Sequence, residues 1–264
     1  MKILVKFPTR GRPVRFLDTF KKYVDFAHNK PDIFFMVTLD SDDETVTPEF
    51  INDIQSTFSN VQVDVDTSGT KIAAINRDMK KAPHYDILLL ASDDMIPVKP
   101  GYDEIIRNNM KKYYPDTDGV LWFNDGIQGR NLNTLCILGR KYYNRFGYIY
   151  YPEYKSFYCD DEFTYIATQL RKQTYFNDII IKHDHSLING IWDVTYAKNS
   201  IHAEEDKKLY NQRRIKLYKQ HINVVVTNLH TPNIIVDIPK KQTNDGSYKI
   251  RYNNYSNYKF KLRR

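Results

Sequence analysis

The sequence predicts an α/β protein whose mostly parallel, Rossmann-like sheet carries helices on both faces. Over the first third of the chain, apolar strand-like segments alternate with segments in which apolar residues recur at helical spacing. This order is typical of parallel sheets with right-handed crossovers. The stretch DILLLASDD is apolar from Ile87 to Ala91 and ends in Ser92, Asp93 and Asp94. Such a short apolar run predicts a strand buried on both faces.

The segments before this strand can be assigned in order. Apolar residues at helical spacing follow Pro13, and a proline is favoured in the first turn of a helix. We expect strands over Lys2–Phe7, Asp32–Leu39 and Val61–Val65, and helices from Pro13 to Pro31, over Pro48–Phe58 and over Ser68–Met79.

After Asp94 the pattern becomes less regular, beginning with a loop that Pro97 and Pro100 bracket. Strand and helix signals then follow without strict alternation. We expect a helix over Tyr102–Tyr114, strands over Gly119–Phe123 and Asn133–Leu138, a short helix over Tyr142–Phe146, a helix from Phe163 to Leu170, a strand over Ile179–Ile181, a charged amphipathic helix over Ala203–His221 and a hairpin of Asn233–Ile238 with Ser247–Tyr252.

Composition narrows the class of protein. The 264 residues suffice for one large α/β domain or for a domain with an appendage. The two cysteines form no disulfide framework and no metal-type spacing, so a reducing cytoplasmic location is expected. No apolar run reaches the roughly 18 residues of a transmembrane segment, and the first residues do not resemble a signal peptide.

The net charge of +7 is concentrated at the carboxyl end. Residues 240–264 contain eight Lys or Arg and one acid, Asp245, interleaved with aromatic residues, whereas the remainder of the chain is neutral. Cations that neutralise phosphates and rings that stack on bases favour nucleic-acid binding by this tail. An anionic membrane surface and a solvated terminal hairpin are the alternatives.

Acidic side chains follow two of the predicted parallel strands. Asp40 ends one strand, and Asp93 and Asp94 end the central one. Ligands of open α/β sheets bind beyond the carboxyl ends of the strands. Adjacent carboxylates there favour a hard divalent cation, which would in turn hold phosphates. A polar turn without a ligand is the alternative interpretation.

Five features in order resemble the GT-A fold glycosyltransferases, and among them the family 2-like enzymes. The resemblance covers roughly residues 1–200. Its motifs are a strand ending in Pro8-Thr9-Arg10, a strand ending in Asp40, the segment from Gly69 to Asn76-Arg77, the strand ending in Ser92-Asp93-Asp94, and Asp160-Asp161-Glu162-Phe163 followed by His183-Asp184-His185.

The resemblance implies a binding site for a nucleoside-diphosphate sugar, commonly a UDP-sugar. Thr9 and Asp40 correspond to positions that hold the base in that family, and a carboxylate can accept a hydrogen bond from a base N–H. The other residues that the resemblance places at the donor are Pro8, Arg10, Lys71, Asn76, Arg77, Ser92 and Asp93. Each of the cations among them is equally consistent with a solvated surface position.

The resemblance also implies a Mn²⁺ or Mg²⁺ ion that bridges the diphosphate. Asp94, the last residue of the D-x-D-like motif, is the expected ligand, although Ser92 stands where the family has its first Asp. His183 and His185 alternate after a strand and therefore point the same way, as two further ligands would. A structural role for either histidine is the alternative.

Asp160 is the expected general base for an acceptor hydroxyl, with Asp161 as the second choice. The segment from Cys159 to Phe163 is similar to the E-D-x-x-[LF] motif of inverting family members, with Cys159 at the Glu position. A neighbouring carboxylate and burial raise proton affinity, which suits a base. Acids stabilised at a helix amino terminus are the structural alternative.

These residues lead to one functional hypothesis and two rivals. The chain is expected to be an inverting, metal-dependent glycosyltransferase acting on an acceptor hydroxyl. A polyanion such as a hydroxylated DNA base is one candidate acceptor, and an uncharged glycan or protein hydroxyl is the alternative. Residues 1–200 would form the catalytic domain, divided into a nucleotide-sugar half (1–94) and an acceptor half (95–200), and residues 201–264 a helix and basic tail. The rivals are a non-catalytic nucleotide-sugar or nucleic-acid binding module and a nucleotidyltransferase.

Overall fold

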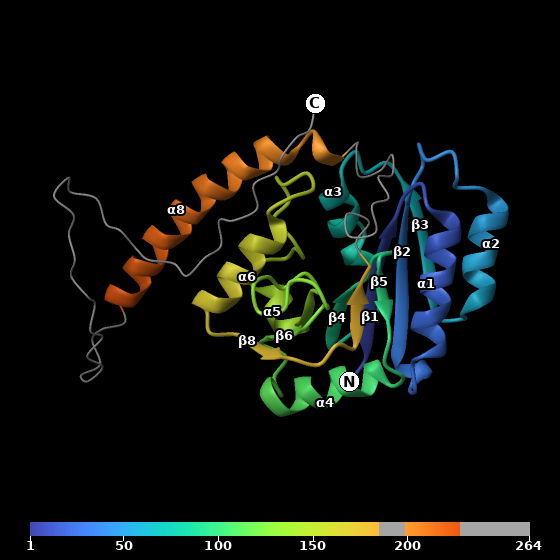
Figure 1. Ribbon diagram of the computed structural model, residues 1–264, viewed down its shortest axis with the longest axis horizontal. Helices are drawn as coiled ribbons and strands as arrows, with labels where there is room; N and C mark the ends of the chain where they lie inside the picture. Colours follow the sequence, from blue (N-terminus) through green and yellow to red (C-terminus); the bar gives the residue numbers. More distant parts are fainter. Residues whose placement is uncertain (185–198, 228–264) are drawn as a thin grey trace. The chain divides into compact units, whose positions relative to one another are not determined.

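A seven-stranded sheet forms the centre of this protein, for which a computed structural model describes residues 1–184 and 199–227 (Figure 1). The strand order is β3-β2-β1-β4-β7-β6-β8, and every pairing is parallel except those of β7 with β4 and β6. The strands are β1 (Ile3–Thr9), β2 (Ile33–Asp40), β3 (Val61–Asp66), β4 (Ile87–Leu90), β6 (Val120–Phe123), β7 (Ile137–Gly139) and β8 (Gln173–Phe176).

Helices cover both faces of the sheet. Figure 1 shows α1 and α2 together on one side of β1, β2 and β3. The longer helices are α1 (Pro13–Asp25), α2 (Pro48–Thr57), α4 (Tyr102–Tyr113), α6 (Cys159–Gln169) and α8 (Ala203–Thr227). The shorter ones are α3 (Lys71–Asn76), α5 (Arg140–Asn144) and the 3-10 turns η1 (Lys30–Asp32) and η2 (Met79–Lys81).

The pleat of β1 separates two hydrophobic cores. Ile3, Val5 and Phe7 point into a core that α1, α2 and α4 cover, whereas Leu4 points into a second core that α3, α5 and α6 cover. Successive side chains of a strand face opposite sides of the sheet, so β1 contributes apolar side chains to both cores. The predicted mostly parallel sheet with helices on both faces is confirmed.

A second, two-stranded sheet, which the sequence did not predict, lies outside the central sheet. The unpredicted strand β5 (Met95–Pro97) comes directly before the loop expected between Pro97 and Pro100, and it pairs antiparallel with β9 (Ile181–His183). The strand expected over Ile179–Ile181 thus lies two residues further along the chain, where its backbone can pair with β5. Neither short strand carries a periodic signal, because three residues are too few to show one.

Other expected elements are shifted or were missed. β8 was not predicted, and β7 begins at Ile137 instead of Asn133. β8 consists of the polar-aromatic sequence QTYF, whose four residues are all half-buried. It pairs with β6 from Gln173 to Phe176. A long-range pairing of this kind overrides weak local preference.

The chain forms two compact units, Met1–Arg214 and Ile215–Arg264. None of the described helices is long and apolar enough to cross a membrane. Some predictions fall outside the described residues. They concern His185, the hairpin of Asn233–Ile238 with Ser247–Tyr252, and the basic tail over residues 240–264.

Candidate active site

Asp94 and His183 meet at the end of the central strand. Asp94 follows β4, and the pairing of β5 with β9 places His183 opposite Met95. The Nε2 atom of His183 lies 3.7 Å from the Oδ2 atom of Asp94. The hydroxyl of Ser92 donates a hydrogen bond to the other carboxylate oxygen of Asp94. Two of the three residues predicted to hold a metal ion are therefore adjacent, and a serine orients one of them.

Asp125 lies at the other ring nitrogen of His183. Its Oδ2 atom is 3.5 Å from His183 Nδ1, and the residue is 2% exposed. The backbone N–H groups of Ile127 and Gln128 donate to Oδ1 at 2.9 and 2.7 Å, and the hydroxyl of Thr134 donates to Oδ2 at 2.6 Å. A carboxylate held this firmly fixes the orientation of an imidazole ring. No sequence motif pointed to this residue.

The charges of these three side chains are mutually stabilising. Burial lowers the pKa of His183, but contacts with Asp125 and Asp94 outweigh burial and raise the pKa to about 9. Burial raises the pKa of Asp94 and of Asp125, yet His183 and neighbouring hydrogen-bond donors hold both values well below the ordinary range. The positive charge of protonated His183 thus lies between the Asp94 and Asp125 carboxylates. A divalent cation would compensate the same negative charges.

Asp94 and His183 fit a metal site that is completed by substrate. Donor atoms 3.7 Å apart can both bind one ion at metal–ligand distances of about 2.0–2.2 Å. Within the described residues, no three His, Cys, Asp or Glu side chains form a closed metal cage. Mg²⁺-type sites with one or two protein ligands rely on phosphate oxygens and water for the rest.

Asp160 lies in the first turn of α6, and its pKa is affected by the charge of His183, the residue that pairs with Asp94. Burial raises the pKa of Asp160, and the positive charges of Lys71 and His183 oppose this shift. Lys71, the first residue of α3, also lowers the pKa of Asp94. One exposed lysine and one histidine therefore act electrostatically on both the Asp160 and the Asp94 carboxylate.

Asp161, the alternative base, has different neighbours. Burial and the negative charge of Asp160 raise the pKa of Asp161 to about 7. Its own charge raises the pKa of Tyr158 and of Tyr210, a residue of α8. Of the two carboxylates, only Asp160 therefore has its pKa affected by His183 and Lys71.

Asp93 points into the fold. It is 5% exposed, and its carboxylate pairs with Arg12 at 2.9 Å. Its backbone oxygen accepts hydrogen bonds from Thr19 at 2.9 Å and from Arg15 at 3.2 Å. Asp93 thus fastens the end of β4 to α1, and Asp94 alone of this acid pair contacts His183.

The predicted base-binding residues gather at the ends of β1 and β2. Pro8 and Thr9 pair in register with Thr38 and Leu39, which places them beside Asp40. The Thr9 hydroxyl oxygen is buried and has no hydrogen-bond partner among the described residues. An unpaired buried hydroxyl costs about 1–3 kcal/mol, so a ligand atom that paired with it would bind favourably.

Two arginines flank Asp40, which is 6% exposed. Arg10 approaches one carboxylate oxygen at 3.0 Å and Arg77 the other at 3.4 Å. Arg10 also pairs with Asp42 at 2.5 Å. The carboxylate is therefore already held in place by two protein cations.

Arg77 and Asn76 also serve the fold. Arg77 donates to the backbone oxygens of Leu39 at 2.6 Å and Asp66 at 2.5 Å, and so joins the ends of β2 and β3. The amide of Asn76 donates to the Tyr150 backbone oxygen at 2.6 Å. These two side chains anchor α3, which leaves Lys71 as the exposed polar residue of the three predicted there.

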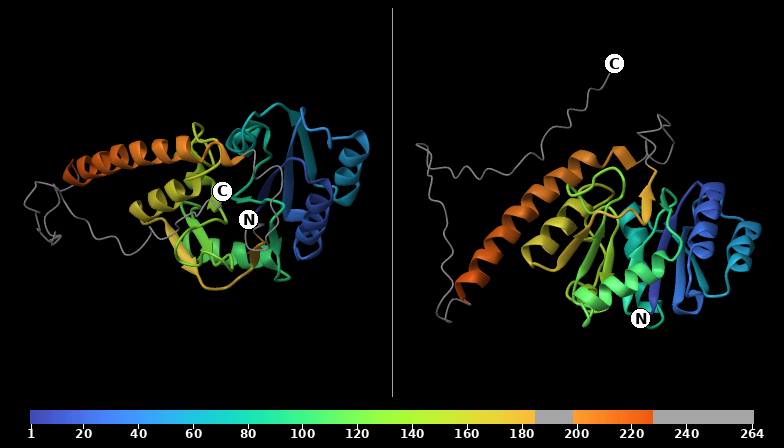
Figure 2. Two further views of the ribbon diagram at one scale, coloured as in Figure 1. Left: turned by 45° about the horizontal axis from the view of Figure 1, so that its top comes forward. Right: turned by 60° about the horizontal axis from the view of Figure 1, so that its bottom comes forward.

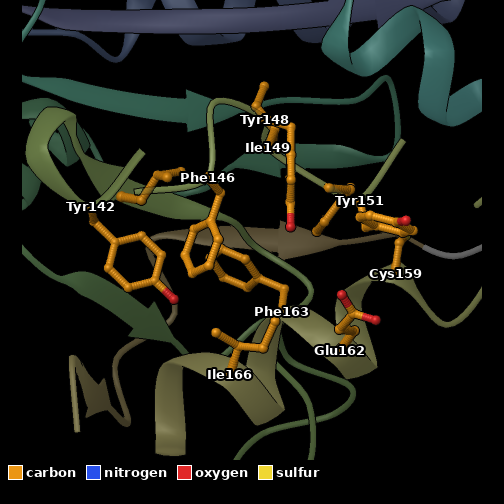
Figure 3. A pocket seen from close by; sticks show the side chains of 11 residues that line it. Tyr142, Phe146, Tyr148, Ile149, Tyr151, Cys159, Glu162, Phe163 and Ile166 are labelled. Atoms are coloured by element: carbon orange, nitrogen blue, oxygen red, sulfur yellow. The ribbon is translucent and has the colours of Figure 1, made fainter. Parts of the chain in front are cut away.

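An aromatic cluster packs against α6 (Figure 3). It encloses a cavity of about 20 Å³, which has room for about one water molecule. Figure 3 shows Tyr142, Phe146 and Phe163 around this space, with the Glu162 carboxylate on the α6 side. The cavity is too small for a sugar, so the cluster is a core that supports α6.

The sheet topology defines the class of fold. The order of a parallel half, with Asp40 and Asp94 at its carboxyl ends, and an antiparallel β7 is that of the GT-A fold, and the predicted fold is confirmed. No protein-family model matches the chain, and no curated protein matches it in sequence.

Several solved structures of glycosyltransferases superimpose on this chain. The mannosyltransferase PcManGT from Pyrobaculum calidifontis, in complex with GDP-Man and Mn²⁺, superimposes with a TM-score of 0.57 at 12% identity over 69% of this chain and 56% of its own. S. aureus TarS superimposes with a TM-score of 0.56 at 15% identity over 70% of this chain and 37% of its own. The 1–349 segment of TarS with UDP-GlcNAc gives 0.55 at 15% identity over 73% and 62%. This chain therefore spans less than two thirds of each of these structures.

Proposed function

We propose that this protein is a metal-dependent glycosyltransferase that moves a sugar from a nucleoside-diphosphate sugar, most favourably a UDP-sugar, to an acceptor hydroxyl. The observation that carries the proposal is the pairing of Asp94 with His183 at the carboxyl end of β4. The charges of His183 and Lys71 also lower the proton affinity of Asp160, at the start of α6. Support for the donor comes from structures of the same fold, one of which holds GDP-Man with Mn²⁺ and another UDP-GlcNAc.

Each group of the site has a role in holding the donor. Asp94 and His183 would bind Mn²⁺ or Mg²⁺, and the ion would stabilise the negative charge of the departing nucleoside diphosphate. Lys71 supplies a further positive charge for the diphosphate. Thr9 and Asp40 would hydrogen-bond the base, because one offers an unpaired hydroxyl and the other a fixed carboxylate.

Asp160 would act on the acceptor. The acceptor oxygen forms a bond to the anomeric carbon, its proton passes to the Asp160 carboxylate, and the bond to the diphosphate oxygen breaks with its electron pair. A single displacement of this kind inverts the anomeric configuration. Burial raises the pKa of Asp160, which increases the affinity of its carboxylate for the acceptor proton.

The charge of the chain supports a polyanionic acceptor, of which a hydroxylated base in DNA is one example. Residues 240–264, which lie outside the described residues, hold eight basic side chains interleaved with aromatic ones. Cations bind phosphates, and aromatic rings stack on unpaired bases. A donor site in the body and a phosphate-binding tail would together direct the sugar to nucleic acid.

A thermal-shift panel tests the donor site directly. The protein is heated with UDP, GDP, CDP, TDP or ADP, each with and without Mn²⁺. A ligand at a hundredfold excess over its dissociation constant stabilises the fold by about 2.7 kcal/mol. We expect one nucleotide to raise the melting temperature in the presence of Mn²⁺ and not in its absence.

The panel also separates the rival functions. No stabilisation by any nucleotide would refute the donor site. Metal-dependent binding without hydrolysis or transfer of any sugar nucleotide would assign the chain to the non-catalytic modules, a reading that buried Cys159 at the motif's Glu position favours. Release of pyrophosphate from a nucleoside triphosphate would assign it to the nucleotidyltransferases.

A further inference from the structure

We infer that one face of α8 positions Asp160 by holding the chain on both sides of it. The side chains of Asp206, Tyr210 and Arg213 follow one another at helical spacing and therefore share a face. They contact the segment before α6, the residue at its start and its first turn. We call the contacts of these three residues the clamp, and their existence does not depend on the proposed function. Only the effect of the clamp on catalysis rests on that function.

Asp206 binds the segment that leads into α6. It is completely buried, and its two carboxylate oxygens accept hydrogen bonds from three consecutive backbone N–H groups. The donors are Lys155 at 2.9 Å, Ser156 at 2.8 Å and Phe157 at 2.8 Å. Hydrogen bonds to an ionised acceptor are about twice as strong as neutral ones. A buried carboxylate without these three donors would be unstable, so helix and segment are ordered together.

Tyr210 contacts the residue at the amino-terminal end of α6. Its ring stacks on Tyr158 with centroids 5.7 Å apart and an interplanar angle of 23°. Tyr158 has a φ of 60°, a left-handed conformation that bulky residues rarely adopt. Such a conformation persists where neighbouring contacts enforce it. Asp160 follows two residues later, so this backbone turn sets the direction in which its helix begins.

Arg213 binds a side chain in the first turn of α6. Its guanidinium forms two hydrogen bonds with Glu162, at 2.7 and 2.8 Å, and it lies 3.1 Å from the centre of the Tyr151 ring. The hydroxyl of Tyr154 donates to the same carboxylate at 2.8 Å. Figure 3 shows the Glu162 carboxylate pointing from α6 toward the segment that carries Tyr151. Glu162, the third acid of the motif, is therefore a positioning residue.

The clamp also reaches the lysine of the site. The backbone oxygen of Lys155, whose N–H group binds Asp206, accepts a hydrogen bond from the N–H group of Ile72 at 3.2 Å. Ile72 follows Lys71, the cation that acts on both Asp160 and Asp94. Figure 2 shows the first part of α8 beside α6 in both views. One helix thus orders the two segments that carry the base and its cationic neighbour.

The test compares Asp206→Asn and Arg213→Lys with a matched control. Asp206→Asn keeps the shape of the side chain but replaces one acceptor oxygen with a donor group, and Arg213→Lys keeps the charge but not the paired geometry. Glu205→Gln removes a charge from the same turn of α8 at an exposed position. If one clamp variant does not fold, the other still gives the answer.

Hydrogen exchange provides the readout that does not depend on enzymatic activity. We expect backbone amides of residues 155–162 to exchange at least about tenfold faster in both clamp variants, because a charge-assisted hydrogen bond has been weakened. Amides of β1 and β4 should exchange as in the unchanged protein, and Glu205→Gln should have no effect. Unchanged exchange over residues 155–162 would overturn the clamp.

Steady-state hydrolysis of UDP-glucose and UDP-N-acetylglucosamine with Mn²⁺ provides the catalytic readout. Misplacement of a catalytic group by about 1 Å costs about a hundredfold in rate. We expect kcat to fall about tenfold to a hundredfold while KM for the donor stays within about twofold. Faster exchange with unchanged kcat would overturn the positioning role. Faster exchange in a protein that binds no nucleotide would leave the clamp standing and refute the proposed function instead.

Discussion

The imidazole of His183 lies between two carboxylates, with its Nε2 atom 3.7 Å from Asp94 and its Nδ1 atom 3.5 Å from Asp125. The contact with Asp94 arises because β5 and β9 pair, although they are far apart in the sequence. One carboxylate is available to a ligand, and the other is held by backbone N–H groups inside the fold. This division of roles leads to different predictions for the two acids.

Replacing Asp94 should abolish the metal-dependent part of nucleotide binding. In Asp94→Asn, the amide is a poor ligand for Mn²⁺, so UDP with Mn²⁺ should no longer raise the melting temperature above the value with UDP alone. Asp18→Asn, at an exposed position of α1, is the control and should behave as the unchanged protein. Full Mn²⁺-dependent stabilisation in Asp94→Asn would exclude Asp94 as a ligand.

Replacing Asp125 should weaken the metal site without removing a ligand. Loss of a carboxylate that orients a metal-binding histidine typically costs about 10–100-fold in metal affinity. We expect Asp125→Asn to raise the dissociation constant of Mn²⁺ by that factor, as measured by titration calorimetry with UDP present. Thr134→Val, which removes one hydrogen bond to Asp125, should give a smaller effect in the same direction.

Replacing Asp160 should separate binding from chemistry. Without the carboxylate the acceptor proton has no base, and general-base catalysis contributes about 10²–10⁴-fold. We expect Asp160→Asn to lose this factor in kcat while UDP and Mn²⁺ bind as before. Asp161→Asn should retain most of the activity. A larger loss in Asp161→Asn than in Asp160→Asn would reverse the assignment.

Asp161 should make stability fall as the pH rises toward neutrality. Its pKa in the folded protein is about 7, above the ordinary value of 3.8, so the folded state binds more protons between these pH values. The stability associated with the protonated form is present below the ordinary pKa and is lost as the pH rises through about 7. Asp161→Asn should therefore raise the melting temperature at pH 8 by at least about 2 °C and leave it nearly unchanged at pH 4. A lower melting temperature at pH 8 would contradict this prediction.

Removing residues 240–264 should abolish salt-sensitive DNA binding. Eight basic side chains lie in this segment, and each phosphate contact contributes about 0.9 to the slope of log K against log salt. We expect the slope for a duplex to fall by up to about 7 in the truncated chain. UDP binding with Mn²⁺ serves as the control and should remain. An unchanged slope would show that the tail does not contact phosphates.

The sequence alone was sufficient for the parallel half of the fold and for the acids at its strand ends. Hydrophobic periodicity is local, so β1, β2 and β4 could be recognised from a few neighbouring residues each. The position of a polar residue directly after such a strand is then enough to place Asp40 and Asp94 at the ligand-binding edge. These predictions needed no knowledge of distant contacts.

The tertiary structure alone decided which side chains meet. Asp125 was missed because its function depends on a histidine from another strand and on no motif of its own. Asp93 was assigned to the ligand, but its side chain pairs with Arg12 across the fold. In the sequence, Asp206 is one of several acids in a charged helix. In the structure it is completely buried and accepts hydrogen bonds from three backbone N–H groups. Long-range packing determines burial and pairing, and a linear pattern does not encode these contacts locally.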